Sequence, residues 1–451
     1  MSLSDHPKAY GTAALVAAFA TGILVTLGFK DAYPELESRF QEKRRRPGGR
    51  SGKGGLGKRR SSIFWGTAPV TLEDHEQDSF TSPSEGIAED GIAGCIGNTP
   101  LIRIQSLSEA TGRTILAKAE FLNGAGNSPK DRVALRIIRE AESQGLLTPH
   151  RGDTIYEGTV GSTGISLATL ARALGYRAHI CMPDDQSHEK SDLLLHLGAA
   201  VERVAVAPIT SPDHFVNLAR RRAVEHAAAH EDGSRGFFAD QFESPANWQA
   251  HFATTGPEIW RQTGGLVDAF VAGAGTGGTI AGVARYLKRG GGGEAKKTTP
   301  RRVRVVLADP QGSGLYNKIK HGVMYAPTER EGTRRRQQVD SMVEGVGVNR
   351  VTANFEAGRD LVDDAVKVTD EQACRMARWL VEKDGIFVGS SSAVNCVGAV
   401  ATALTLPAGS VVVTMLCDSG TRHLSKFWKH IKAAGLEEHE ATDLFAELGL
   451  S

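Results

Sequence analysis

Residues 266–288 read LVDAFVAGAGTGGTIAGVARYLK. An apolar, β-branched run ends at Gly273, a glycine-rich turn follows, and a segment of helical periodicity begins at Gly278. Glycines let backbone N–H groups approach an anion, and the positive end of the helix dipole favours negative charge. The hydroxyls of Thr276 and Thr279 add donors. The pattern predicts an α/β fold with an anion site at this loop.

The same loop also fits a different ligand. Gly273, Gly275 and Gly278 satisfy the G-x-G-x-x-G pattern of dinucleotide-binding folds, which further requires an acidic residue after the second strand. Asp309 follows the next predicted strand. A nicotinamide-dependent oxidoreductase is therefore an alternative, as is a tight turn that binds no ligand.

Outward from this stretch, short apolar runs alternate with helical segments from Gly91 onward. The predicted strands are Thr154–Tyr156, Ala178–Met182, Leu266–Ala272, Val303–Ala308 and Val411–Leu416. The predicted helices are Ile165–Leu174, Ser187–Leu197, Asn247–Gln262, Gly278–Lys288 and Thr421–Ala434. Such alternation implies parallel sheets with crossover helices, and the length favours two packed α/β subdomains.

Three further segments place polar groups at predicted helix starts. The turn Thr159–Gly164 offers amides and hydroxyls to a carboxylate. Pro129 at the first helical position puts Lys130 in the first turn, where the dipole favours a neutral amine or an imine. A serine cluster, Ser390–Ser392, follows an apolar run. Taken singly, the serine cluster and the turn equally fit helix caps, and Lys130 fits a surface ion pair.

The N-terminal region differs from this body. Residues 9–29 carry no charge, and 21 residues at about 1.5 Å per residue span roughly 31 Å, enough to cross a bilayer. A cleaved targeting segment and a buried core helix are the alternatives. Between Arg39 and Arg60, ten Lys and Arg residues stand against one acid, Glu42. This glycine-rich run predicts a disordered linker on the cytosolic side of a membrane.

Composition excludes several classes of protein. The net charge of the 451 residues is only +1, and because the basic run is so positive, the remainder is mildly acidic. This balance argues against a nucleic-acid partner. None of the five cysteines forms a C-x-x-C pair, so zinc knuckles, iron–sulfur runs and disulfide frameworks are not expected, and we predict no metal site.

Taken together and in order, these segments resemble the fold-type II pyridoxal-phosphate enzymes, in particular cysteine synthase (O-acetylserine sulfhydrylase) and cystathionine β-synthase. The resemblance runs from about Gly94 to about Lys429. It is carried by Gly97-Asn98-Thr99-Pro100-Leu101, Ser128-Pro129-Lys130-Asp131-Arg132, Gln241-Phe242, Thr254-Thr255-Gly256-Pro257-Glu258-Ile259-Trp260 and Gly275-Thr276-Gly277-Gly278-Thr279.

The resemblance implies a role for each candidate residue. Lys130 is expected to form the Schiff base with pyridoxal 5'-phosphate. The phosphate is expected on Gly275, Thr276, Gly277, Gly278 and Thr279, the pyridine nitrogen on Ser391, and a further cofactor contact on Ser162. The substrate is expected to contact Thr159, Val160, Gly161, Ser162, Thr163, Gln241 and Gly345.

The implied reaction is β-replacement. The Lys130 amine removes the α-proton of O-acetyl-L-serine, acetate leaves to give an aminoacrylate, and sulfide adds to give L-cysteine. Pyridoxal phosphate is the electron sink. The neutral Ser391 is expected to leave the ring nitrogen unprotonated, which favours β-elimination and replacement over transamination.

One loop departs from the family pattern. Where the family reads T-S-G-N-T-G, this chain has Val160 in place of Ser and Ser162 in place of Asn. Losing a charge-assisted hydrogen bond typically costs about 1.5–3 kcal/mol, so use of O-acetylserine is expected to weaken. A cysteine desulfhydrase-type β-elimination and a cofactor-bound, non-catalytic membrane scaffold are therefore alternatives.

The resemblance also implies the organisation of the chain. We predict a transmembrane anchor at 1–30, a basic then acidic linker at 31–90, a catalytic domain at 91–435 with a small subdomain inserted at about 128–240, and a C-terminal tail helix at 436–451. The N-terminal additions resemble those of fungal cysteine synthases of the mitochondrial outer membrane. We expect a single-pass homodimer facing the cytosol; the mitochondrial interior is the alternative.

Overall fold

The computed structural model describes residues 88, 90–186, 188–229, 231–289, 303–324, 341–438 and 440–450. The predicted anchor at 1–30 lies outside these residues, as does almost all of the linker at 31–90. Across the described residues, no helix has the length and apolar character needed to span a bilayer.

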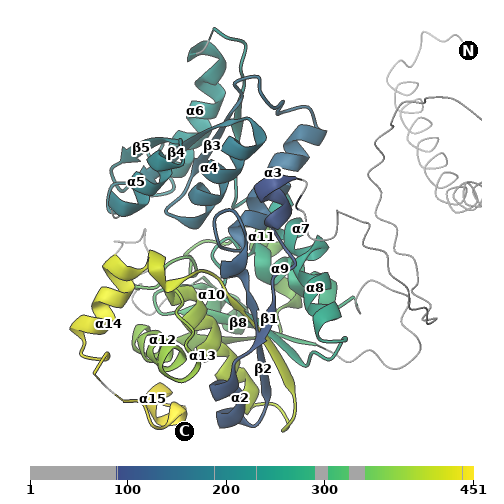
Figure 1. Ribbon diagram of the computed structural model, residues 1–451, viewed down its shortest axis with the longest axis vertical. Coiled ribbons are helices and arrows are strands. Elements are labelled where there is room, and N and C mark those ends of the chain that lie inside the picture. Colours follow the sequence, from purple (N-terminus) through teal and green to yellow (C-terminus); the bar gives the residue numbers. More distant parts are fainter. Residues whose placement is uncertain are drawn as a thin grey trace, which may run out of the picture. The chain divides into compact units, whose positions relative to one another are not determined.

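The described strands form two sheets (Figure 1). The large sheet has the order β1-β2-β10-β7-β8-β9, with β1 antiparallel to β2 and every other pair parallel. Its strands are β1 (Leu101–Arg103), β2 (Thr114–Ala119), β7 (Ala269–Ala272), β8 (Arg304–Pro310), β9 (Asp364–Val368) and β10 (Val411–Leu416). The small sheet is wholly parallel, in the order β5-β4-β3-β6. Its strands are β3 (Thr154–Gly158), β4 (Arg177–Pro183), β5 (Ala200–Val204) and β6 (Gly236–Phe238).

Helices cover both faces of each sheet, as the predicted alternation requires. The α-helices are α2 (Gln105–Thr111), α3 (Lys130–Ser143), α4 (Ser162–Leu174), α5 (His188–His196), α6 (Phe215–Ala229), α7 (Ala246–Ala253), α8 (Thr255–Gln262), α9 (Gly278–Leu287), α10 (Leu315–His321), α11 (Ala353–Glu356), α12 (Asp370–Asp384), α13 (Ser390–Leu404), α14 (Lys429–Ala433) and α15 (Leu444–Leu448). Short 3₁₀ or π turns are η1 (Gly91–Cys95), η2 (Glu120–Leu122), η3 (Arg359–Leu361), η4 (Gly420–Arg422) and η5 (Leu424–Trp428).

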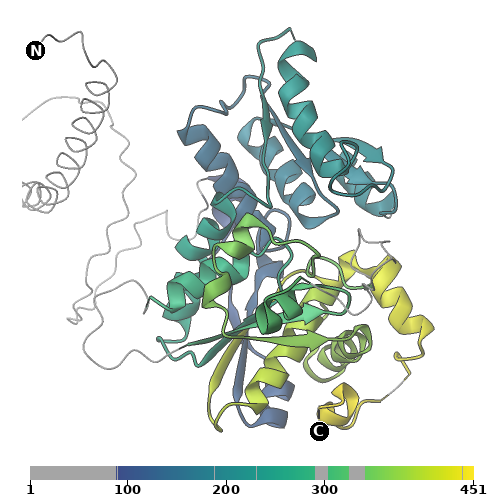
Figure 2. The same cartoon turned by 180° about the vertical axis from the view of Figure 1, so that it is seen from behind.

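Four apolar clusters of buried side chains hold the layers together. On one face of the large sheet, α2, α12, α13 and α15 supply the buried side chains, and on the other face α8, α9, α10 and α11 do so. The view from behind shows the second of these layers in front of the sheet (Figure 2). In the small sheet, α3, α4 and α5 pack on one face, while α6 packs on the other against Cys181. Each sheet therefore lies between helical layers and is buried on both faces.

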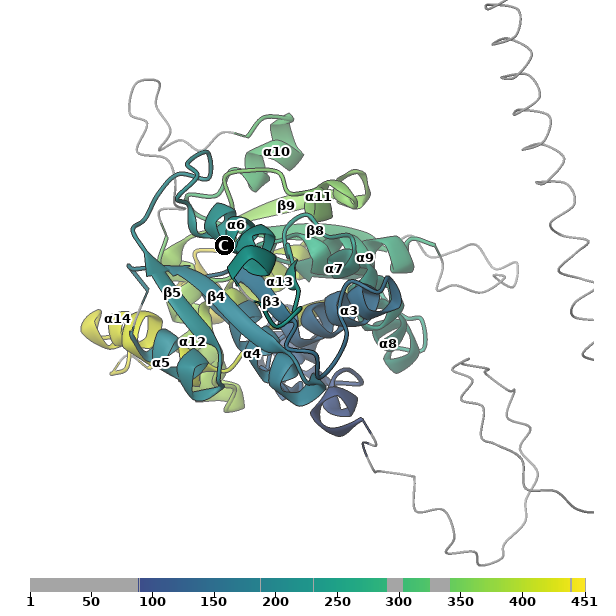
Figure 3. The same ribbon diagram turned by 90° about the horizontal axis from the view of Figure 1, so that it is seen from above.

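Loops that follow parallel strands converge where the two sheets face each other. The segments after β3, β7 and β10 all leave the carboxyl ends of their strands, which is where open α/β sheets bind ligands. Seen from above, the small sheet with α4, α5 and α6 lies over the large subdomain (Figure 3). The fold thus brings together loops that are far apart in sequence.

Several predicted elements differ in detail. The single helix predicted at Asn247–Gln262 is wrong: α7 ends at Ala253 and α8 begins at Thr255. Pro257 explains the break, because a proline fits the first turn of a new helix but not the interior of a continuous one. The predicted strand at 266–272 begins only at Ala269, since Gly264 and Gly265 adopt positive φ in the turn before it.

The end of the chain is also less regular than predicted. Instead of one helix at Thr421–Ala434, the chain forms η4, then the π turn η5, and only then α14. The Trp428 N–H donates to His423 O at 3.0 Å, and its indole N–H donates to Val388 O at 3.2 Å. These bonds anchor the indole and favour the wider turn. In the tail, the helix is limited to Leu444–Leu448.

Candidate active site

A cavity of about 870 Å³ lies between the two subdomains. Its lining includes Lys130 and the loops after β3 and β7. Of the predicted site residues, Thr159, Val160, Gly161, Ser162, Thr163, Gln241, Gly275, Thr276, Gly277, Thr279, Gly345 and Ser391 also line it. Gly278 is the exception and forms the first turn of α9 behind the loop. The structure therefore gathers the predicted residues around a single space.

Lys130 is the first residue of α3, with Pro129 as the N-cap. Its backbone N–H donates to Ser128 Oγ at 3.3 Å, while its side chain makes no ion pair or hydrogen bond within the described residues. Burial lowers the pKa of the Lys130 amine, and Cys417 and Asp418 partly oppose that shift. A buried amine with a lowered pKa is suited to covalent bonding with a carbonyl and to proton transfer.

The loop Gly273–Gly277 has the geometry of an anion cradle. Within the described residues, the backbone N–H groups of Gly275, Thr276 and Gly277 donate to no protein acceptor, and α9 begins directly after them. Side chains are excluded because a Cβ at Gly275 would lie 2.3 Å from Gly345 O, and one at Gly277 would lie 2.4 Å from the Phe355 Cβ. The loop thus presents free donors at a helix N-terminus, as phosphate requires.

A layer of polar side chains holds this loop from behind. Asn247 Nδ2 donates to Thr276 Oγ1 at 2.9 Å, and Thr352 Oγ1 donates to Thr276 O at 2.7 Å. His251 Nε2 lies 3.1 Å from Thr279 Oγ1, and burial lowers the pKa of His251 to about 3, so the ring is neutral. The sequence did not single out Asn247 or His251, because their contribution depends on α7 packing beside α9.

The loop after β3 forms the opposite wall. Thr163 Oγ1 donates to Gln241 Oε1 at 2.5 Å, which ties this loop to the segment after β6. Ser162 begins α4, and its carbonyl accepts from Ser166 Oγ at 2.9 Å. Val160 is 39% exposed on the cavity wall, so it presents methyl groups where the family has a hydroxyl. Within the described residues, the N–H groups of Val160, Ser162 and Thr163 donate to no protein acceptor and can bind a carboxylate. Gln241 Nε2 donates to Glu157 Oε1 at 3.4 Å and to Gly158 O at 3.5 Å.

Ser391 lies at the floor of the cavity, in the first turn of α13. It is buried and hydrogen-bonded to the thiol of Cys417, which sits at the end of β10. Burial raises the pKa of Cys417 to about 11, so the thiol is neutral. Gly345 faces the same serine: a Cβ there would lie 3.9 Å from Ser391 Oγ. Ser391 can therefore offer a neutral hydroxyl to a flat ligand.

A buried ion network close to Lys130 in the sequence of α3 joins three of the sequence motifs. Arg132 Nε contacts Glu120 Oε2 at 2.7 Å, and its Nη1 contacts Glu258 Oε1 at 2.6 Å. Lys118 Nζ contacts Glu258 Oε2 at 2.6 Å, and the Asn98 N–H donates to Glu258 Oε1 at 3.0 Å. Burial alone would raise the pKa of Glu258, but Arg132 and Lys118 hold it down to about 2. These motif residues fix the helix that carries Lys130.

A second charged group at the mouth of the cavity was not predicted. Glu344 Oε2 accepts from Lys190 Nζ of α5 at 2.9 Å, and Glu344 Oε1 lies 3.3 Å from Lys426 Nζ of η5. Burial alone would raise the pKa of Glu344, but Lys190 and Lys426 lower it below its ordinary value. Because α5 belongs to the small subdomain and Glu344 to the large one, this ion pair bridges the cleft. No local motif signals such a pairing.

The position of Asp309 argues against the alternative of a dinucleotide-binding oxidoreductase. Its carboxylate is fully buried and accepts from the Tyr316 N–H at 2.7 Å, near the start of α10. Burial raises the pKa of Asp309 to about 6, and the residue does not line the cavity. An acid that binds a ribose must reach the ligand. Asp309 instead holds the turn between β8 and α10.

Comparison with known proteins agrees with this geometry. The family model described as "Pyridoxal-phosphate dependent enzyme" matches residues 92–418. The chain is 70% identical to "Cysteine synthase 2" of Neurospora crassa, with 100% of this chain and 99% of the relative covered. It is 59% identical to "Cysteine synthase 2" of Emericella nidulans, with 94% of each covered.

Solved structures show the same fold. A crystal structure of O-ureido-L-serine synthase aligns with a TM-score of 0.63 at 30% identity, covering 78% of this chain and 96% of that one. The O-acetylserine dependent cystathionine beta-synthase from Helicobacter pylori aligns with a TM-score of 0.59 at 33% identity, covering 74% and 97%. Both alignments cover nearly all of the solved chain.

Proposed function

Because this chain belongs to the pyridoxal-phosphate dependent enzymes, we propose that it is a cysteine synthase, which replaces the acetoxy group of O-acetyl-L-serine with sulfide and releases acetate. One observation carries the proposal: four groups line one cavity. They are a half-buried lysine and a loop of backbone amides that have no partner among the described residues, a neutral serine, and a loop suited to a carboxylate. This set fits pyridoxal phosphate and an amino acid together. When bound, pyridoxal phosphate supplies the electron sink for a carbanion at the substrate α-carbon.

Residues of this chain hold the cofactor, orient the substrate and transfer the proton. Lys130 is the covalent anchor and, once its amine is free, the base for the α-proton; burial lowers the pKa of that amine, which favours its neutral form. The free N–H groups of Gly275–Gly277 and the hydroxyl of Thr279 hold the phosphate. The loop Thr159–Thr163 and Gln241 orient the substrate carboxylate, which aligns the α-proton toward Lys130.

The test of this function uses the full chain and two assays. With O-acetyl-L-serine and sulfide, we expect L-cysteine and acetate in equal amounts. With L-cysteine alone, we expect little sulfide or pyruvate. Faster breakdown of cysteine than its synthesis would instead identify a desulfhydrase, in which Val160 and Ser162 disfavour the replacement. Absence of both activities in a protein that holds its cofactor would identify a scaffold.

Ser391→Asp tests the neutral hydroxyl at the cavity floor. An anionic carboxylate there is expected to stabilise the protonated ring nitrogen, which strengthens the electron sink and favours transamination. We expect cysteine synthesis to fall at least about tenfold while the fraction of transaminated cofactor rises. The visible spectrum during turnover measures both. Ser419→Asp, at a serine that caps η4, is the control. An unchanged side-reaction profile in Ser391→Asp would contradict this role.

Glu344→Gln tests the ion pair across the cleft. The change keeps the shape of the side chain but removes its charge attraction to Lys190 and Lys426. Since partly exposed ion pairs contribute about 0.2–1 kcal/mol, we expect KM for O-acetylserine to rise about two- to fivefold with little change in kcat. Glu371→Gln, which breaks an exposed pair with Arg375 on α12, is the control. A loss confined to kcat would assign Glu344 to the chemistry instead.

We also propose that residues 9–29 anchor the enzyme in the mitochondrial outer membrane with its catalytic domain facing the cytosol. The uncharged run of 21 residues and the basic segment after it support this arrangement. We propose a homodimer as well. Alkaline extraction and protease protection of isolated mitochondria test the anchor, and light scattering of detergent-solubilised protein tests the dimer. Release by alkaline carbonate would reject the anchor.

A further inference from the structure

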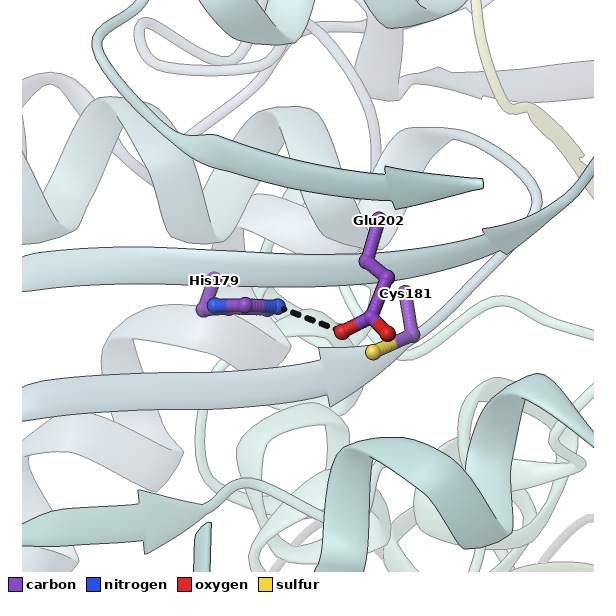
Figure 4. A group of neighbouring side chains, drawn as sticks. All are labelled: His179, Cys181 and Glu202. Atoms are coloured by element: carbon purple, nitrogen blue, oxygen red, sulfur yellow. Dashed lines mark hydrogen bonds and ion pairs between the residues drawn. The ribbon is translucent and has the colours of Figure 1, made fainter. Parts of the chain in front are cut away.

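Three metal-ligating side chains meet on the outer face of the small sheet, away from the cavity. His179 and Cys181 are two residues apart on β4, so they point to the same face, and Glu202 on β5 pairs directly with Cys181 in the register. Figure 4 shows Glu202 reaching across from its strand to the other two side chains. This is the face on which α6 packs.

The ligand atoms of His179 and Glu202 have the spacing that a small divalent cation requires, and the Cys181 sulfur lies near both. One ligand atom from each residue lies within 4.8 Å of the others, and His179 Nε2 is 3.3 Å from Glu202 Oε2. Tetrahedral bonds of about 2.0–2.2 Å hold nitrogen and oxygen ligands roughly 3.4 Å apart. We propose that His179, Cys181 and Glu202 bind a borderline-soft divalent metal ion such as Zn²⁺, with water as the fourth ligand.

Neighbouring residues already orient two of the ligands. Arg222 of α6 donates to Glu202 Oε1 at 2.8 Å and to Oε2 at 3.1 Å. A carboxylate has about four lone-pair sites, so Glu202 can keep Arg222 while it coordinates an ion. Tyr156 stacks on the His179 ring at a centroid distance of 4.9 Å and holds its plane. The side chains of His179 and Glu202 are 23% and 29% exposed, which gives an ion access.

The proton balance of binding follows from the three groups. A neutral His179 ring carries one proton, and Nε2 can act as a ligand when that proton is on Nδ1, so the ring releases no proton. Burial raises the pKa of Cys181 to about 12, so the free protein carries a thiol there. The ion forms a metal–sulfur bond and displaces that thiol proton to solvent. One proton is therefore released for each ion bound.

The site adjoins the loop assigned to the substrate carboxylate. The Thr159 N–H donates to Cys181 O at 3.0 Å, and Gly158 pairs with Cys181 between β3 and β4. An ion bound to the Cys181 thiolate would therefore lie close to the base of that loop, because the Cys181 carbonyl accepts the hydrogen bond from Thr159. The metal site itself does not depend on the proposed function, because it uses none of the residues that line the cavity.

The experiment titrates Co²⁺ into full-chain holoenzyme that has been stripped of metal, without substrate. We expect a sulfur-to-cobalt charge-transfer band that saturates at one ion per chain, with one proton released and reversal by Zn²⁺. Cys181→Ser is expected to lose the band. His179→Gln, a change at a partly exposed residue that leaves the thiol in place, is expected to weaken binding about 10- to 100-fold.

Cys95→Ser removes an exposed thiol and serves as the matched control; it is expected to leave the band unchanged. No charge-transfer band at Co²⁺ concentrations up to about 1 mM would overturn the proposal. So would a band that survives in both Cys181→Ser and His179→Gln. Loss of cysteine synthesis with normal Co²⁺ binding would count against the proposed function and not against this site.

Discussion

Lys130→Ala is expected to abolish cysteine synthesis. The substitution removes both the covalent anchor of the cofactor and the base for the α-proton, and a positioned base alone contributes about 10²–10⁴-fold to rate. We expect kcat to fall at least about 10³-fold and the visible absorption of covalently held pyridoxal phosphate to disappear. Initial rates and the absorption spectrum of the same sample measure both effects.

Two comparisons separate chemistry from folding in this variant. Lys288→Ala removes an ammonium from the end of α9, where it pairs with Asp363 outside the cavity, and is expected to retain full activity. A small primary amine added to Lys130→Ala is expected to restore part of the activity by replacing the missing base. Activity within tenfold of the wild type in Lys130→Ala, with the visible band intact, would show that another residue performs these roles.

Arg132→Met is expected to give the largest loss of stability. Arg132 lies between Glu120 and Glu258, and all three side chains are buried. Its removal leaves Glu258 with Lys118 as its cationic partner and leaves Glu120 with the neutral donors Thr99 and Asn123. Breaking a buried ion pair by removing one partner typically costs about 3–5 kcal/mol. We expect the free energy of unfolding, measured by denaturant titration at pH 7, to fall by about that amount.

The same network is expected to make the free energy of unfolding depend on pH in the acid range, and Arg132→Met is expected to remove that dependence. Because the pKa of Glu258 is lowered from 4.5 to about 2, its contribution is present above pH 4.5 and disappears as pH falls toward 2. Arg132→Met is expected to flatten stability over this window. Arg139→Met removes a partly exposed partner of Glu142 in the same helix and is expected to cost less than about 1 kcal/mol. Equal losses in the two variants would contradict the assignment.

The sequence predicted those site residues that lie close together in the chain, and it missed those that only the fold brings together. The glycine loop, Lys130 at a helix start and the serine cluster each combine a turn with the helix after it, so their residue types alone were informative. Glu344 and Lys190 lie far apart in the chain and meet only because two subdomains face each other. The same holds for His179 and Glu202, which come together through the register of β4 and β5.

The fold shows the same division. Alternating apolar runs predicted two parallel-sheet subdomains, but not that β2 would pair with β10. The errors in helix boundaries arose where tertiary bonds competed with periodicity. Pro257 lies in the first turn of a second helix. The indole N–H of Trp428 donates to Val388 O, a contact that helical periodicity does not predict. Asn98, Arg132 and Glu258 lie in the segments that carry the family resemblance, but the sequence did not predict that they would form a buried support for α3.

The pairing of β2 with β10 has a consequence for biosynthesis. Val411 aligns with Thr114, so the centre of the large sheet closes only when a strand near the C-terminus meets one made early. The small sheet, in contrast, is contiguous in sequence from β3 to β6. On the ribosome, the small subdomain can therefore fold during synthesis. The edge of β2 that pairs with β10 stays unpaired until translation is nearly complete. That interval is when a nascent chain most needs protection from aggregation.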